Sequence, residues 1–103
     1  MLDKIVKIPT KPGIYFFKDA NNQIIYIGKA KSLRKRVRSY FSSSIKTDPK
    51  TRVLVKNISK IDYLIVRTET EALLTEANLI KQHKPRYNVY LKDDKTFPYI
   101  KIS

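Results

Sequence analysis

The feature that most constrains this chain is a predicted β-hairpin over residues 13–28. Two runs rich in β-branched and aromatic residues, 13–17 and 24–28, flank a polar segment that contains Asn21 and Asn22. Adjacent asparagines tolerate left-handed backbone and bond their own main chain, which is typical of the turn between paired strands. The rest of the fold is expected to be organised around this antiparallel pair.

Side-chain alternation along the two strands assigns residues to opposite faces. In the first strand, Tyr15 and Phe17 share one face. In the second strand, Ile25 and Ile27 are predicted to share a face, with Tyr26 on the opposite one. Pairing of the strands could bring the phenols of Tyr15 and Tyr26 together, although alternation alone leaves the register open.

Net charge narrows the class of partner. The 103 residues contain 22 Lys and Arg against 9 Asp and Glu, which gives a formal net charge of +13. Such an excess points to a polyanion, and nucleic acid is favoured because no segment is long and apolar enough to span a bilayer. A charge cluster of this density is more typical of a phosphate-binding surface than of a merely solvated face. The residues predicted to contact DNA follow the hairpin directly and are Lys29, Lys31, Arg34, Arg36 and Arg38.

Length and cysteine content bound the domain organisation and the compartment. A chain of 103 residues predicts one domain with a single modest core. The sequence has no cysteine, which excludes disulfides and thiolate metal sites and fits a reducing cytoplasm.

Helical and extended patterns alternate after the hairpin. A helix is predicted over 33–41, because apolar side chains recur there on one face at helical spacing. A second, basic helix over 50–57 is expected to bury Val53, with Leu54 beside it. The run 61–67 is nearly all apolar and predicts a central strand. The mixture of predicted helices and strands indicates the α+β class.

A long helix over 69–84 carries an unusual acidic residue. Thr68 and Glu71 predict a capping box at its start, and Pro85 is the expected stop. At about 100° per residue, Glu76 falls inside an apolar stripe. The other members of this stripe are Ala72, Leu73, Ala77, Leu79 and Ile80.

Two interpretations of Glu76 stay open. It could lie at the edge of the stripe, in a salt bridge with one of the many cations. Alternatively, it could bind Mg²⁺, which takes one or two protein carboxylates together with water and phosphate oxygens. The nine acidic residues form no dense cluster of the kind that a two-metal nuclease needs, so we expect one ion.

Tyr15 and Tyr26 also have two interpretations. Most strand tyrosines simply pack. A phenol, with a pKa of about 10, acts as a base only where cations or a metal stabilise the phenolate. Lys29 and the arginines could supply that environment, and the base would then take a proton from water that attacks a phosphodiester. The sole histidine, His83, is expected to lie at a helix end rather than in the catalytic site.

Two triplets in the hairpin carry a resemblance to a known family. Residues 13–15, Gly-Ile-Tyr, and 26–28, Tyr-Ile-Gly, are the triplets after which the GIY-YIG nuclease family is named. The chain resembles in particular the N-terminal domains of UvrC proteins, over essentially its whole length. The segments that extend the similarity are 26–31, 36–41, 75–81, 85–89 and 93–95. The resemblance implies a small three-stranded antiparallel sheet flanked by helices, the GIY-YIG endonuclease fold.

The same resemblance implies which residues form the site. Glu76 matches the metal-binding glutamate of the family, and the implied cofactor is one Mg²⁺ or Mn²⁺ ion. The other implied catalytic residues are Tyr15, Tyr26, Lys29, Arg36, Tyr40 and Asn88.

The implied function is a metal-dependent DNA endonuclease that makes the 3′ incision at a lesion in bacterial nucleotide excision repair. The expected partners are damaged double-stranded DNA and UvrB, and UvrB is expected to be contacted mostly through regions absent here. No interaction with a membrane is expected. Residues 1–103 are expected to be one monomeric, cytoplasmic catalytic domain excised from a longer protein. Two alternatives stay open: a non-catalytic basic nucleic-acid-binding module, and another GIY-YIG endonuclease, either homing or structure-specific. The basic module accounts for the charge but leaves the placement of Glu76 and of the paired tyrosines to chance.

Overall fold

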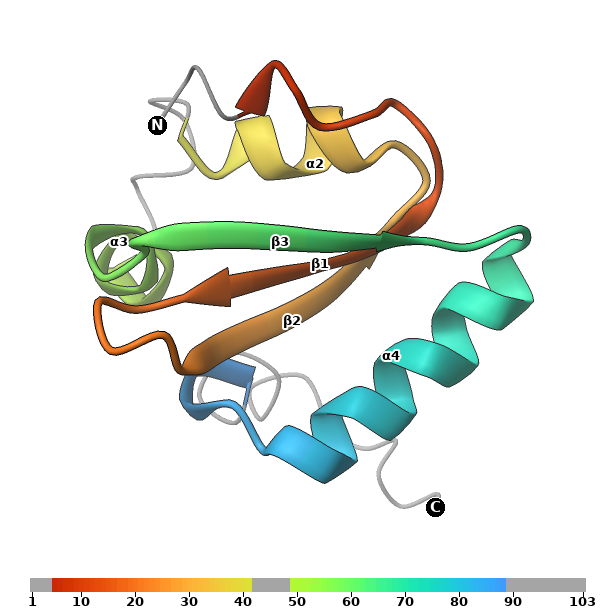
Figure 1. The fold of residues 1–103 in the computed structure, drawn as a ribbon. Helices are drawn as coiled ribbons and strands as arrows, with labels where there is room; N and C mark the ends of the chain where they lie inside the picture. The colour runs from red at the N-terminus through yellow and green to blue at the C-terminus, as the bar shows by residue number, and fades with distance from the viewer. Residues whose placement is uncertain (1–4, 42–48, 89–103) are drawn as a thin grey trace.

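The computed structural model describes residues 5–41 and 49–88 of the chain. They form a three-stranded antiparallel sheet with helices on both sides, which confirms the predicted α+β class (Figure 1). The predicted turn at 93–95 and the final extended run at 99–102 lie outside the described residues. The elements are β1 (Gly13–Lys18), β2 (Ile24–Ala30), α2 (Leu33–Ser39), α3 (Pro49–Lys56), β3 (Lys60–Ile65) and α4 (Glu69–His83).

The sheet has the strand order β2-β1-β3, so the central strand is β1. The prediction of a central strand over 61–67 is therefore wrong, because β3 is an edge strand. Its side chains Tyr63, Leu64 and Ile65 are each more than 40% exposed. An apolar run identifies a strand, but its position in the sheet depends on which neighbours pair with it.

The hairpin turn forms as the asparagines predict, with an irregularity in the second strand. The Asp19 carboxylate accepts hydrogen bonds from the backbone N–H groups of Asn21 and Gln23, and Asn22 has a φ of 63°. A β-bulge then shifts the pairing, so that Tyr26 lies opposite Phe17 and Ile24 opposite Lys18.

This bulge corrects the predicted faces of β2. Ile25 has no partner residue in the register and joins the same buried cluster as Tyr26, whereas Ile27 joins the cluster on the other side. Strict alternation predicted the opposite arrangement for Ile25. An unpaired extra residue restarts the period of two, and such a residue leaves no clear mark in composition.

Two hydrophobic clusters cover the two faces of the sheet. The larger one contains Tyr15 and Phe17 with Leu33 and Val37 of α2, and the smaller one contains Ile14 of β1. Helix α4 packs chiefly on β2, on the far side of the sheet from α2 (Figure 1). The segment before β1 also contributes to the core, because Ile5 and Ile8 are at most 3% exposed.

Helix α3 buries one of the two residues predicted for its inner face, Leu54, but not Val53. Leu54 is fully buried and Thr51 is nearly so, whereas Val53 is 48% exposed. None of the helices within residues 5–41 and 49–88 is long and apolar enough to cross a membrane.

Helix α4 begins and ends close to the predicted residues. The Thr68 hydroxyl accepts a hydrogen bond from the backbone N–H of Glu71, and the Glu71 carboxylate accepts one from the N–H of Arg67. The buried stripe is narrower than predicted, since only Ala72 and Glu76 are buried and Leu73 is 53% exposed. Ala77 is exposed as well. A helix that rests on the edge of a small sheet buries less than half of its circumference.

Candidate active site

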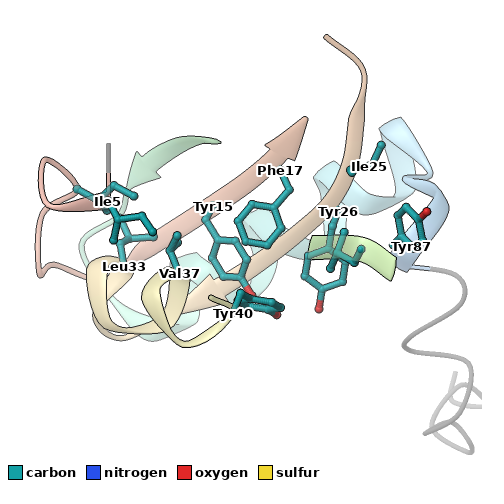
Figure 2. Close-up of a cluster of buried hydrophobic side chains, with 11 residues drawn as sticks. Ile5, Tyr15, Phe17, Ile25, Tyr26, Leu33, Val37, Tyr40 and Tyr87 are labelled. Atoms are coloured by element: carbon teal, nitrogen blue, oxygen red, sulfur yellow. The ribbon is translucent and has the colours of Figure 1, made fainter. Parts of the chain in front are cut away.

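Three tyrosines from different elements meet in the larger core cluster. Tyr15 of β1, Tyr26 of β2 and Tyr40, which follows α2, are 1%, 7% and 5% exposed. Their ring centroids lie 5.8 to 6.2 Å apart, and the hydroxyls of Tyr15 and Tyr40 share a hydrogen bond of 2.8 Å. Figure 2 shows the three rings converging beside Phe17. We call Tyr15, Tyr26 and Tyr40 the tyrosine cluster.

The two triplet glycines make this cluster possible. Gly28 is the register partner of Tyr15, whose phenol lies across the position that a Cβ at residue 28 would occupy. Gly13 faces the backbone carbonyl of Leu64 in the same way. Each glycine is therefore required by a close approach of neighbouring atoms, because neither has a positive φ.

The electrostatic environment keeps the phenols of Tyr15 and Tyr26 protonated. Burial, together with the neighbouring phenols Tyr40 and Tyr26, raises the pKa of Tyr15 well above its ordinary value. Burial and Tyr40 raise the pKa of Tyr26 strongly as well, and the nearby guanidinium of Arg36 opposes both shifts without cancelling them. The expectation that surrounding cations would favour a phenolate does not hold for the protein alone, since desolvation dominates.

Arg36 connects the tyrosine cluster to an open cavity. Its Cζ lies 5.5 Å from the Tyr40 ring centroid. Burial lowers the pKa of Arg36, but the phenols of Tyr15, Tyr40 and Tyr26 raise it by more than burial lowers it. The guanidinium therefore stays charged. The cavity measures about 520 Å³ and lies between β2, α2 and α4; we call it the α2–α4 cleft. Its polar lining comprises Lys29, Lys31, Arg36, Glu69 and Thr70.

Glu76 occupies the predicted place in the stripe of α4. It is 7% exposed and lies one turn after Ala72, which lines the α2–α4 cleft. Its negative charge contributes to the raised pKa of Tyr26, so the carboxylate lies near that phenol. Within residues 5–41 and 49–88, no group of three His, Cys, Asp or Glu side chains could hold a metal ion. A single carboxylate fits Mg²⁺ or Mn²⁺ bound together with water and phosphate oxygens, rather than a closed protein cage.

Asn88 is buried, but it is engaged with the backbone of β2. Its side-chain carbonyl accepts a hydrogen bond from the N–H of Ile27, and its amide donates one to the carbonyl of Ile27, both at 2.8 Å. This pair of bonds occupies the open edge of β2 beside the second triplet. The contacts make Asn88 a residue that holds the strand carrying Tyr26 in place.

The basic residues predicted to contact DNA differ in how accessible they are. Lys29, Arg36 and Arg38 are exposed, and exposed Lys31 lies 3.5 Å from the Glu69 carboxylate. Arg34 is only half-exposed, and its Nε donates a 2.7 Å hydrogen bond to the carbonyl of Ile8. That bond ties α2 to the segment before β1, a role that composition could not have predicted.

Comparison with known families finds one match that covers most of the chain. A family model described as a UvrC-like GIY-YIG domain matches residues 11–89. Among curated proteins, UvrABC system protein C of Bdellovibrio bacteriovorus is 54% identical over 101 residues, and that of Chlorobium phaeobacteroides is 55% identical over 102. These alignments include 98% and 99% of this chain but only 16% of either relative.

Solved structures give a similar result. The GIY-YIG N-terminal endonuclease domain of UvrC from Thermotoga maritima, bound to magnesium as its catalytic divalent cation, is 40% identical with a TM-score of 0.75. The match covers 85% of this chain and 94% of that one. Point mutants of the Thermotoga domain with phenylalanine in place of a tyrosine, also bound to the catalytic divalent cation, have the same TM-score.

Proposed function

Because the chain belongs to the UvrC-like GIY-YIG domain family, we propose that it is a metal-dependent DNA endonuclease domain. Its reaction is hydrolysis of one phosphodiester on the 3′ side of a lesion in bacterial nucleotide excision repair. The observation that carries this proposal is the position of Glu76, a buried carboxylate near the phenol of Tyr26 and one turn from the α2–α4 cleft. A purely structural or DNA-binding domain would have no need for a buried acid in that place.

Glu76 would hold one Mg²⁺ or Mn²⁺ ion. When bound, such an ion polarises a phosphate oxygen and lowers the pKa of coordinated water. A carboxylate with few protein neighbours of its kind leaves coordination positions for solvent and for substrate, as an endonuclease requires.

The tyrosine cluster would position the attacking water. Tyr15 and Tyr26 carry their protons in the folded protein, so either phenol can donate a hydrogen bond to that water. Either one can accept a proton from the water only after it has lost its own phenolic proton. Tyr40 fixes the Tyr15 hydroxyl through their 2.8 Å hydrogen bond. The cluster therefore supplies orientation first, and Tyr15 and Tyr26 are both candidates for the general base.

Positive charge at the α2–α4 cleft would bind the phosphate. Arg36 and Lys29 line the cleft, where they can neutralise charge that builds on the phosphate during attack. Lys31, Arg34 and Arg38 extend the positive surface along the DNA backbone. Asn88 would act as a positioning residue through the backbone of Ile27.

Partners and context follow from the proposal. The 103 residues would be a single, monomeric catalytic domain within a longer protein that acts in the bacterial cytoplasm. UvrB would present the damaged duplex, mainly through regions of the longer protein outside this chain.

The test compares Glu76→Gln with Glu71→Gln, a matched change of an exposed acid on the same helix. Each variant is incubated with a lesion-containing duplex, with and without UvrB, in Mg²⁺ or Mn²⁺. We expect Glu76→Gln to lose at least about 100-fold in incision and to lose Mn²⁺ binding measured by calorimetry, with DNA affinity retained. Glu71→Gln should match the wild type. Retained incision by Glu76→Gln would remove Glu76 from the mechanism, and no incision by the wild type under any condition would favour a non-catalytic DNA-binding module.

A further inference from the structure

A second cavity lies at the opposite end of β2 from the α2–α4 cleft. It measures about 570 Å³ and lies between the hairpin turn and the end of α4, and we call it the hairpin pocket. In Figure 1 the hairpin turn and the segment after α4 lie together, away from the start of α4. The polar residues of its lining are Lys18, Asn22, Gln23, His83, Lys84 and Arg86, and none of the described residues that line it is a carboxylate.

Two cations of this pocket are not neutralised by the described part of the chain. Lys18 Nζ lies 2.7 Å from the Asp62 carboxylate, so its charge is balanced. The ion pairs found among residues 5–41 and 49–88 include neither Lys84 nor Arg86. The described residues therefore give the pocket a net positive charge.

The helix dipole explains only part of this charge. Cations in the last turn of a helix, such as Lys81 or His83, stabilise its negative end. Arg86 lies beyond that turn, after Pro85, where the influence of the dipole has fallen off. Its position calls for a different explanation.

The backbone that carries these cations is fixed before any ligand binds. Lys84 has a φ of 46°, and its N–H donates a 2.7 Å hydrogen bond to the carbonyl of Ile80. Pro85 is fully buried, and the Arg86 Cζ lies 6.0 Å from the ring centroid of buried Tyr87. A site whose frame is already ordered loses less conformational entropy when it binds an anion.

The pocket and the α2–α4 cleft lie along the same strand and the same helix. Ile24 lines the pocket and Lys29 lines the cleft, so five residues of β2, or about 17 Å, separate them. Along α4, the eleven residues from Ala72 to His83 also span about 17 Å. One strand of a DNA duplex advances about 3.4 Å per nucleotide, so this separation corresponds to about five nucleotides.

We propose that the hairpin pocket binds a phosphodiester group of the DNA backbone about five nucleotides from the phosphate that Lys29 and Arg36 would bind in the α2–α4 cleft. This inference rests on the proposed endonuclease function and defines how the duplex lies on the domain. Lys84 and Arg86 supply the charge, and arginine can donate two parallel hydrogen bonds to one phosphate. The site would set the register of the DNA relative to Glu76 without reading its sequence.

The test is a double variant, Lys84→Asn with Arg86→Gln, in which asparagine tolerates the left-handed backbone at residue 84. The charge-matched control replaces Lys7 and Lys56 with glutamine, since both are exposed and line neither cavity. DNA affinity is measured without divalent metal, over a range of salt concentrations. Single neutral methylphosphonates are placed at successive positions on either side of the expected cut.

We expect the pocket variant to bind DNA about tenfold more weakly than the control, with a salt slope smaller by about one. In the wild type, a methylphosphonate about five nucleotides from the phosphate at the α2–α4 cleft should weaken binding, and the pocket variant should no longer respond to it. Equal affinities of the two variants would overturn the inference even if the wild type cuts DNA. The expected phosphate dependence without any cutting would overturn the proposed function and leave the pocket assignment standing.

Discussion

Replacing Gly28 with alanine tests how the second triplet supports the tyrosine cluster. An alanine Cβ at residue 28 would lie 2.8 Å from Cε2 of Tyr15 and closer still to its Cζ and hydroxyl. Carbon atoms in contact prefer about 3.5 to 4.0 Å, so the phenol would have to move. It has no space to do so, because Tyr15 is 1% exposed and lies against Phe17, Tyr26 and Tyr40.

The expected loss of stability follows from three contributions. Overpacking a buried site destabilises by about 1 to 3 kcal/mol. Displacing the phenol also breaks the Tyr15–Tyr40 hydrogen bond, which contributes about 1 kcal/mol. Alanine offsets about 0.5 kcal/mol by restricting the unfolded chain. We therefore expect Gly28→Ala to lower the free energy of unfolding by about 1.5 to 3.5 kcal/mol, or roughly 6 to 28 °C in Tm.

Urea and thermal unfolding followed by circular dichroism measure this loss, and a second substitution identifies its cause. In a Tyr15→Leu background the ring is absent, so adding Gly28→Ala should lower stability by less than about 0.5 kcal/mol. In a Tyr15→Phe background the ring carbons remain, and most of the loss should persist. Gly13→Ala is the control, because its obstacle is the Leu64 carbonyl and Tyr15→Leu should not relieve it. A stable Gly28→Ala protein, or an equal loss in the Tyr15→Leu background, would refute the reasoning.

Two further predictions concern the same strands. Asn88→Ala leaves the buried N–H and carbonyl of Ile27 without their 2.8 Å partners. We therefore expect the free energy of unfolding to fall by about 2 to 4 kcal/mol and hydrogen exchange at the Ile27 amide to become faster. Protection of that amide equal to the wild type would contradict the role assigned to Asn88. Burial raises the pKa of Tyr15 and Tyr26, so their contribution to stability is complete below a pH of about 10 and is lost as pH rises above it. Tyrosinate absorbance should show these two phenols ionising only with unfolding, and Tyr15→Phe should unfold less readily at alkaline pH than the wild type.

Local patterns along the chain predicted much of the secondary structure. The asparagine turn, the helix after the hairpin and the capped helix α4 depend on neighbouring residues, and they formed close to the predicted positions. Periodicity also placed Glu76 in a buried stripe, where it is 7% exposed. Capping and periodicity act over a few residues, so they can be read without knowing the fold.

Predictions that depend on distant partners were less successful. The run 61–67 was expected to be a central strand, but it lies at an edge because β1, not β3, has two neighbours. Val53 was expected to be buried and is 48% exposed, since the face that α3 buries depends on where the helix lies. The bulge at Ile25 could not have been predicted from alternation.

The sequence by itself determined that this chain has a hairpin, a basic surface and a carboxylate turned into an apolar helix face. Its motifs also identified the family, because the triplets and the segments after them are similar along most of the chain. Only the tertiary structure decided that three phenols meet, with Tyr15 packed over Gly28, that Asn88 holds β2, and that two cationic cavities lie along one strand. These features join residues from different elements, and no spacing along the chain encodes the contact between them.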